Sequence, residues 1–122
     1  MSYIRYKNNS LFVESVSVRS LASKLSTPFY LYSEGNIIEN YKSFSRNFKK
    51  SNPLICFSVK ANSNIQILKV LRKMGSGADV VSGGELLKAI KSGIKPNKIV
   101  FSGVGKTEDE IKLAIRKNIL LI

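Results

Sequence analysis

The chain has 122 residues, 43% of them hydrophobic, and a formal net charge of +12, and its length favours one domain with a modest core over a disordered segment. The positive charge would suit a nucleic acid or an anionic surface, but the lysines and arginines are spread along the whole sequence without an arginine-rich block. We therefore expect no nucleic-acid partner, and a basic binding module, whose affinity would fall steeply with salt, is kept only as an alternative.

The first part of the chain carries the patterns of a short β segment and a helix. Residues 11–13 form a short apolar run, and residues 16–25 carry apolar side chains at helical spacing. Thr27 and Pro28 would stop that helix, because proline cannot continue it. The aromatic run over residues 29–32 predicts a strand.

A longer amphipathic helix is predicted next, over residues 35–48. Ser33 is a plausible N-cap, since its hydroxyl can accept from a backbone amide of the first turn. An aromatic stripe along one helix face is nearly always buried, so we expect this one in the core. The stripe consists of Ile37, Tyr41, Phe44 and Phe48.

From residue 55 onward, apolar strand patterns alternate with helical patterns at a period of about 20 residues. Such alternation predicts parallel strands joined by right-handed crossovers. It fits a (β/α)8 barrel better than an open sheet, because no dinucleotide fingerprint occurs. We therefore predict an α/β fold: an incomplete TIM-type barrel of three βα units and the start of a fourth, preceded by a short N-terminal β segment. The expected strands are 55–59, 78–81, 99–101 and 119–122.

The last expected strand would leave an exposed hydrophobic edge, which predicts that the sequence is the N-terminal part of a longer protein. Two helices of this region have clear start signals. Ser82 with Glu85, and Thr107 with Glu110, match the S/T-x-x-E capping box. Gly93 would close the first of these two helices.

Lys60 follows the expected strand 55–59 at its carboxyl end. Because side chains alternate along a strand, Cys56, Ser58 and Lys60 would share the inner face and the larger hydrophobes the outer one. Barrels bind ligands at this end, where a partly desolvated amine could lose its proton and form a Schiff base. The hypothesis requires the amine to be held inward. The pattern alone favours a solvated lysine at a strand end.

Two acidic residues lie in the next unit. Asp79 falls within an apolar strand, where a carboxylate needs a cation or hydrogen-bond donors; it either faces Lys60 across adjacent strands or lies at a frayed strand end. Glu85 is already explained by the capping box. The turn over residues 82–84 could let the backbone approach a ligand, although a tight strand-to-helix turn needs the same residues.

Several classes of site are excluded. The chain has no histidine and one cysteine, Cys56, which rules out a histidine-based triad or metal site and an internal disulfide. Residues 103–107 end like a phosphate loop, but Val100 occupies the position of its first glycine. No apolar run is long enough for a signal peptide or a membrane span, so we expect a cytoplasmic protein with no metal and no membrane partner.

Three segments, VKANSN around Lys60, ADVVSGGEL around Asp79 and FSGVGKTEDEI from Phe101, occur in the order and at the spacing of one family. They resemble the fold-type III decarboxylases that use pyridoxal phosphate, and look most like the start of a diaminopimelate decarboxylase. The resemblance runs from about residue 11 to the last residue. Alanine racemases differ, because their usual continuation after the lysine does not match residues 62–64.

The resemblance implies that Lys60 is the catalytic lysine and holds pyridoxal phosphate covalently, with Asp79 and Glu85 beside the cofactor. It also implies an amino-acid substrate, meso-diaminopimelate, that is converted to L-lysine and carbon dioxide by a homodimer. Residues 1–33 would belong to a β domain otherwise absent, and residues 34–122 would begin the cofactor-binding barrel.

Because the family's other site residues come later, we expect this chain alone to be inactive or nearly so. The alternatives are an ornithine, arginine or carboxynorspermidine decarboxylase, or a barrel protein that carries pyridoxal phosphate without catalysis.

Overall fold

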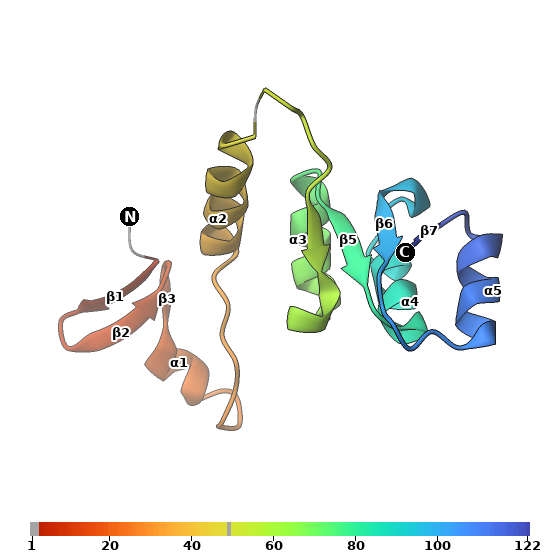
Figure 1. The fold of residues 1–122 in the computed structure, drawn as a ribbon. Helices are drawn as coiled ribbons and strands as arrows, with labels where there is room; N and C mark the ends of the chain where they lie inside the picture. The colour runs from red at the N-terminus through yellow and green to blue at the C-terminus, as the bar shows by residue number, and fades with distance from the viewer. Residues whose placement is uncertain (1–2, 49) are drawn as a thin grey trace. The chain divides into compact units, whose positions relative to one another are not determined.

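The computed structural model describes residues 3–48 and 50–122, and the chain divides into two compact units, residues 1–40 and 41–122. Each unit has its own sheet. The first contains a three-stranded antiparallel sheet and the second a four-stranded sheet with the order β4-β5-β6-β7 (Figure 1). The predicted α/β class is therefore confirmed, and each unit is described separately below.

The first unit contains a β-hairpin, of which the sequence predicted only the apolar run over residues 11–13. Strand β1 was missed, although Asn8 and Asn9 were a usable signal. Both have positive φ, 48° and 59°, as a two-residue hairpin turn requires. The elements are β1 (Ile4–Lys7), β2 (Ser10–Val13), β3 (Val16–Ser17), α1 (Val18–Ala22) and α2 (Glu34–Arg46), of which α2 continues into the second unit.

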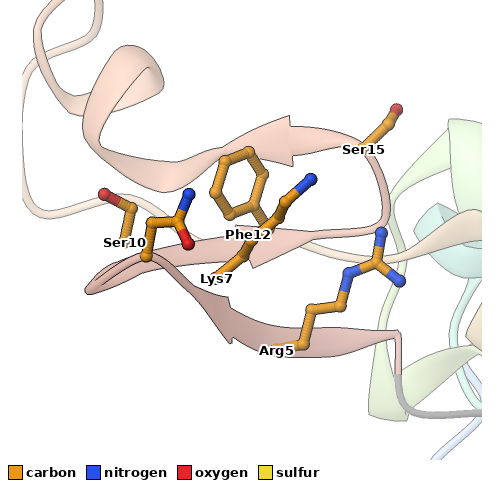
Figure 2. Close-up of a pocket in the computed structure, with 6 residues that line it drawn as sticks. Arg5, Lys7, Ser10, Phe12 and Ser15 are labelled. Atoms are coloured by element: carbon orange, nitrogen blue, oxygen red, sulfur yellow. The ribbon is translucent and has the colours of Figure 1, made fainter.

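One face of the hairpin gathers positive charge. Arg5 lies opposite Phe12 and Lys7 opposite Ser10 in the β1–β2 register, and Figure 2 shows these side chains around one hollow. The hollow has a volume of about 360 Å³. None of its lining residues is acidic, so the even spread of charge along the sequence did not predict this local basic patch. It is lined by Arg5, Lys7, Asn8, Ser10, Phe12 and Ser15.

Two predictions in the first unit were wrong. The helix expected over 16–25 is shorter, because residues 16–17 pair with β2 as β3 and the Ser17 hydroxyl accepts from the Ser20 amide as the cap of α1. Residues 29–32 form no strand. Strands need a neighbouring strand to satisfy their backbone groups, and the described chain places none beside this run, where Tyr30 is 90% exposed.

Glu14 joins the hairpin to the start of α2. Its Oε1 accepts from the Ser33 hydroxyl at 2.6 Å and from the Gly35 amide at 2.8 Å. The predicted N-cap is confirmed, because the Ser33 hydroxyl also accepts from the Asn36 amide at 3.0 Å. The hydrogen bond from Ser33, followed by that from the Gly35 amide, holds the pKa of Glu14 below its ordinary value of 4.5.

We expect this junction to weaken in acid. A carboxylate whose pKa is lower in the folded state stabilises the fold above its ordinary pKa, and that contribution is lost as the pH falls through the folded-state pKa. Protection of the Gly35 amide from hydrogen exchange should therefore decrease below about pH 4.5 in the native chain. Glu14→Gln should lower this protection at neutral pH and flatten its pH dependence. Glu34→Gln is the control: it also removes one negative charge, from the first turn of α2 itself. It should leave the protection of the Gly35 amide and its pH dependence unchanged.

In the second unit, strands and helices alternate along the chain, and the strands form one parallel sheet. Its strands pair in parallel, as predicted, and the arrows of β4, β5 and β6 point the same way in Figure 1. The strand predicted over 99–101 has those bounds, and the others agree within two residues. The elements are β4 (Cys56–Ser58), the short 3-10 helix η1 (Val59–Ala61), α3 (Ile65–Lys73), β5 (Gly77–Val80), α4 (Gly83–Lys91), the 3-10 helix η2 (Pro96–Lys98), β6 (Ile99–Phe101), α5 (Glu108–Arg116) and β7 (Leu120–Leu121).

The two faces of this sheet differ in polarity. On one face, strand side chains pack with the apolar sides of the helices into a single buried cluster, as the period-two pattern predicts. The opposite face is only partly buried and carries Cys56, Ser58, Asp79 and Ser102. The cluster includes Val59, Leu68, Ala78, Val80, Leu86, Ile99 and Phe101.

The predicted burial of the α2 stripe was wrong. No residue of α2 is buried, and Phe44 and Phe48 are 54% and 40% exposed. Their rings pack against each other with centroids 5.1 Å apart. Helical periodicity shows that one face is apolar, but it does not supply the layer that would cover that face.

Candidate functional site

Lys60 lies at the carboxyl end of β4, as predicted, but not on the strand itself. The strand ends at Ser58, and Lys60 is the middle residue of η1, which contacts β5 and α4. Val59 points into the core and is fully buried, whereas Lys60 is exposed. The expectation of an inward, partly desolvated amine was therefore wrong for this chain, whose described residues leave the Lys60 side chain exposed.

The Lys60 amine makes no hydrogen bond or ion pair with residues 3–48 and 50–122. The ion pair seen among these residues does not involve Lys60: it joins Lys112 to Glu108 on α5. An uncommitted primary amine at the ligand-binding end of a parallel sheet is chemically available to an aldehyde or an anion.

Asp79 is the centre of a polar cluster that spans three strands. It lies opposite Ser58 of β4 and Val100 of β6 in the register. Ser58 donates to its Oδ2 at 3.3 Å, and Ser102, just after β6, donates to its Oδ1 at 2.5 Å. Asp79 is thus satisfied by two hydroxyls within a regular strand and not at a frayed end. The expected contact with Lys60 is not formed. Sequence reasoning missed Ser102, which directly follows the predicted strand 99–101.

Cys56 lies on the same face as Asp79. Burial, and next the negative charge of Asp79, raise the pKa of its thiol, which therefore stays neutral. Within the described residues no group of three histidine, cysteine, aspartate or glutamate side chains is placed to hold a metal ion. None of the helices described there is long and apolar enough to cross a membrane.

Glu85 caps the corner between β5 and α4, though not as a full capping box. The Ser82 hydroxyl accepts from the Glu85 amide at 3.3 Å, as predicted. The Glu85 carboxylate, however, accepts from the amide of Val81 at 3.0 Å instead of that of Ser82. The carboxylate therefore bonds the amide one residue before the N-cap residue Ser82. This bond holds the carboxylate against the end of β5.

Glu110 accepts a hydrogen bond from the amide of Gly83, in the turn over residues 82–84 where a ligand contact was considered possible. Its Oε1 accepts from the Gly83 amide at 2.6 Å. Its Oε2 accepts from the Thr107 amide at 2.9 Å, while the Thr107 hydroxyl accepts from the Glu110 amide, so the predicted capping box of α5 is confirmed. These bonds, first that from Gly83, lower the pKa of Glu110. Sequence reasoning found the cap but not the link to α4.

Gly103 brings the end of β6 against the end of β5. A Cβ on Gly103 would lie 2.8 Å from Cα of Val81, closer than real side-chain contacts allow. We expect Gly103→Ala to destabilise the second unit by about 1–3 kcal/mol, because the backbone has to move. Gly105→Ala is the matched control, since no atom lies within 4 Å of its Cβ position. Urea midpoints measure both, and equal midpoints for the two variants would contradict the close approach.

Residues 34–122 match the family model described as the pyridoxal binding domain of pyridoxal-dependent decarboxylases. The chain is also 45% identical over 119 residues to a diaminopimelate decarboxylase from Aquifex aeolicus, covering 98% of this chain and 28% of that relative. One from Pseudomonas fluorescens is 42% identical, with 94% and 28% covered. The chain thus spans less than a third of the length of these relatives.

Solved structures agree with this relationship. A diaminopimelate decarboxylase from M. jannaschii in complex with L-lysine matches with a TM-score of 0.89 and 38% identity, over 95% of this chain and 28% of that one. A lysine decarboxylase from Selenomonas ruminantium matches with a TM-score of 0.81 and 26% identity, over 99% and 31%. The parallel βα units are confirmed as part of an incomplete TIM-type barrel, and the chain belongs to the family of pyridoxal-dependent decarboxylases.

Proposed function

We propose that this chain provides the cofactor-binding part of an amino-acid decarboxylase, with Lys60 as the residue that binds pyridoxal phosphate. The observation that carries the proposal is the uncommitted Lys60 amine on η1, at the carboxyl end of β4 and within the matched residues 34–122. The turn that holds it contacts β5, which carries Asp79, and α4, which carries Glu85.

The residue types present fit such a cofactor, although the exposed Lys60 lacks the inward, partly desolvated position that the hypothesis requires. An aldehyde condenses with a primary amine, and Lys60 supplies one that no described side chain occupies. Asp79 offers a negative charge on the same edge, oriented by the hydroxyls of Ser58 and Ser102. The cofactor, when bound, supplies an electron sink for the charge left by the departing carboxylate. Lys60 would bind and orient the group and could return a proton through its Nζ, while Asp79 and Glu85 would hold charge beside it.

We further propose that the substrate is meso-diaminopimelate and that the products are L-lysine and carbon dioxide. Relatives named diaminopimelate decarboxylase are 45% and 42% identical to the chain, whereas the lysine decarboxylase structure is 26% identical. No contact among the described residues favours ornithine or arginine instead.

Cofactor attachment is tested by incubating the chain with pyridoxal phosphate, reducing with borohydride and mapping the labelled peptides. The proposal predicts that Lys60 is labelled well above the other lysines. The chain holds 20 lysines and arginines in total, so label spread evenly over many lysines would contradict a preformed site.

The substrate is tested with a chimera in which this chain replaces the matching 28% of the Aquifex aeolicus relative. The chimera should release carbon dioxide from diaminopimelate and not from ornithine or arginine. A folded chimera that loads pyridoxal phosphate but turns over ornithine in preference to diaminopimelate would contradict the proposed substrate.

Assembly as a homodimer stays a prediction that rests on the family resemblance. A cytoplasmic location stays a prediction that rests on the lack of an apolar run long enough for a signal peptide or a membrane span. The division into residues 1–33 and 34–122 is likewise a proposal. Its support is that the family match begins at residue 34.

A further inference from the structure

The corner between β5 and α4 is held by carboxylates from two directions. Inside the corner, Glu85 accepts from the amide of Val81 at 3.0 Å. From outside, Glu110 of α5 accepts from the amide of Gly83 at 2.6 Å, across a separation of 27 residues. The corner begins two residues after Asp79, so both contacts act on the backbone that carries the proposed cofactor residues.

We propose that Glu110 is a positioning residue of the cofactor site: it fixes the β5–α4 corner and so sets where Asp79 and Glu85 lie relative to Lys60. This inference rests on the proposed function. Glu110 itself would not touch the cofactor, because both of its oxygens are already engaged by backbone groups.

The geometry requires a carboxylate at this position. One oxygen of Glu110 faces the Gly83 amide and the other faces the Thr107 amide. Gly83 and Thr107 stand at the N-termini of α4 and α5, where unpaired amides and the helix dipole favour negative charge. Glutamine has a single acceptor oxygen and no charge, so it loses one of the two bonds and keeps the other only as a weaker bond to a neutral acceptor. The bond at the Gly83 amide is therefore either lost or weakened.

The side chain of Glu110 also packs closely against the backbone of Gly83. A Cβ at Gly83 would lie 3.0 Å from Cγ of Glu110, so any larger residue there would have to displace this side chain by a few tenths of an ångström. The same two loops also meet where Gly103 packs against Val81. With this second contact in place, loss of the Glu110 bond should loosen the corner without unfolding the sheet.

The experiment compares Glu110→Gln with Asp109→Asn in the 122-residue chain. Both substitutions remove one negative charge from the first turn of α5, but Asp109 is exposed, whereas Glu110 is partly buried. The first measurement, without cofactor, is hydrogen exchange at the amides of Gly83 and Val81. Loss of a bond to a charged acceptor should speed exchange at Gly83 by about tenfold or more in Glu110→Gln. Asp109→Asn should leave it unchanged.

The second measurement is the yield of borohydride-fixed pyridoxal phosphate at Lys60 relative to the surface lysines. Glu110→Gln should reduce this ratio severalfold, and Asp109→Asn should preserve it. Glu110→Asp keeps the charge but shortens the reach by one methylene, so it should fall between the native chain and Glu110→Gln. This graded response separates positioning from simple charge.

The outcomes are distinguishable. Unchanged exchange at Gly83 in Glu110→Gln, or faster exchange there with an unchanged Lys60 ratio, overturns the positioning role and leaves the proposed function standing. Absence of preferential Lys60 labelling in the native chain overturns the proposed function and the positioning role together. Faster exchange at the corner combined with a lower Lys60 ratio supports both.

Discussion

Lys60→Ala is expected to abolish preferential labelling of the chain by pyridoxal phosphate and borohydride. The Lys60 amine is the one placed on η1, beside β5 and α4, and removal of a primary amine removes the atom that attacks the aldehyde. Label should then be distributed over the surface lysines at the level of a nonspecific reaction. Peptide mapping by mass spectrometry measures the site of each adduct.

Lys60→Arg separates charge from nucleophilicity. Arginine retains the positive charge but does not lose its proton in proteins, so this variant should also lack the preferential label. Lys69→Ala is the matched control, because Lys69 is an exposed lysine on the outer side of α3. Should Lys60→Ala retain the labelling pattern of the native chain, another lysine would be the site and the assignment of Lys60 would be wrong.

Phe101→Ala is expected to cause the largest loss of stability among single substitutions in the second unit. Phe101 is the largest of the fully buried side chains and lies in β6, between the neighbouring strands β5 and β7. Truncation of a buried phenylalanine costs about 3–5 kcal/mol, because apolar contacts are lost and a cavity remains. That is a large part of the roughly 5–15 kcal/mol by which small domains are stable, so the variant should have a much lower urea midpoint or be unfolded in buffer.

Phe44→Ala provides the comparison with the same chemical change. Phe44 is 54% exposed and contacts the ring of Phe48. Its truncation should change the stability by less than about 1 kcal/mol, as for most surface substitutions. Circular dichroism during urea unfolding measures both variants. Similar losses for Phe101→Ala and Phe44→Ala would show that the buried cluster of the parallel sheet is not the main source of stability.

The local features of the second unit were readable from the sequence. The alternation of strands and helices, the strand over 99–101 and the capping box of Thr107 and Glu110 depend on neighbours within a few residues, and local spacing encodes such contacts. The segments around Lys60 and Asp79 indicated the family before any fold was known, because their residue types and spacing are specific to it.

Other local patterns led to wrong predictions, because the predicted strand or buried face needed a neighbouring element from elsewhere in the chain. The aromatic run 29–32 has strand composition but no adjacent strand among the described residues, so it forms none. The stripe that includes Phe44 is amphipathic, but it stays exposed. A pattern states which side of an element is apolar, and only packing against another layer decides whether that side is buried.

The amino-acid sequence by itself thus determined the order of the βα units, the helix caps and the identity of the candidate lysine. Tertiary structure alone decided which groups meet at the edge of the sheet: Ser102 donates to Asp79 across 23 residues, and Glu110 accepts from Gly83 across 27. It also placed Lys60 in an exposed turn and not on the inner face of a strand. Contacts between residues so far apart follow from strand register and loop packing, which no local spacing records.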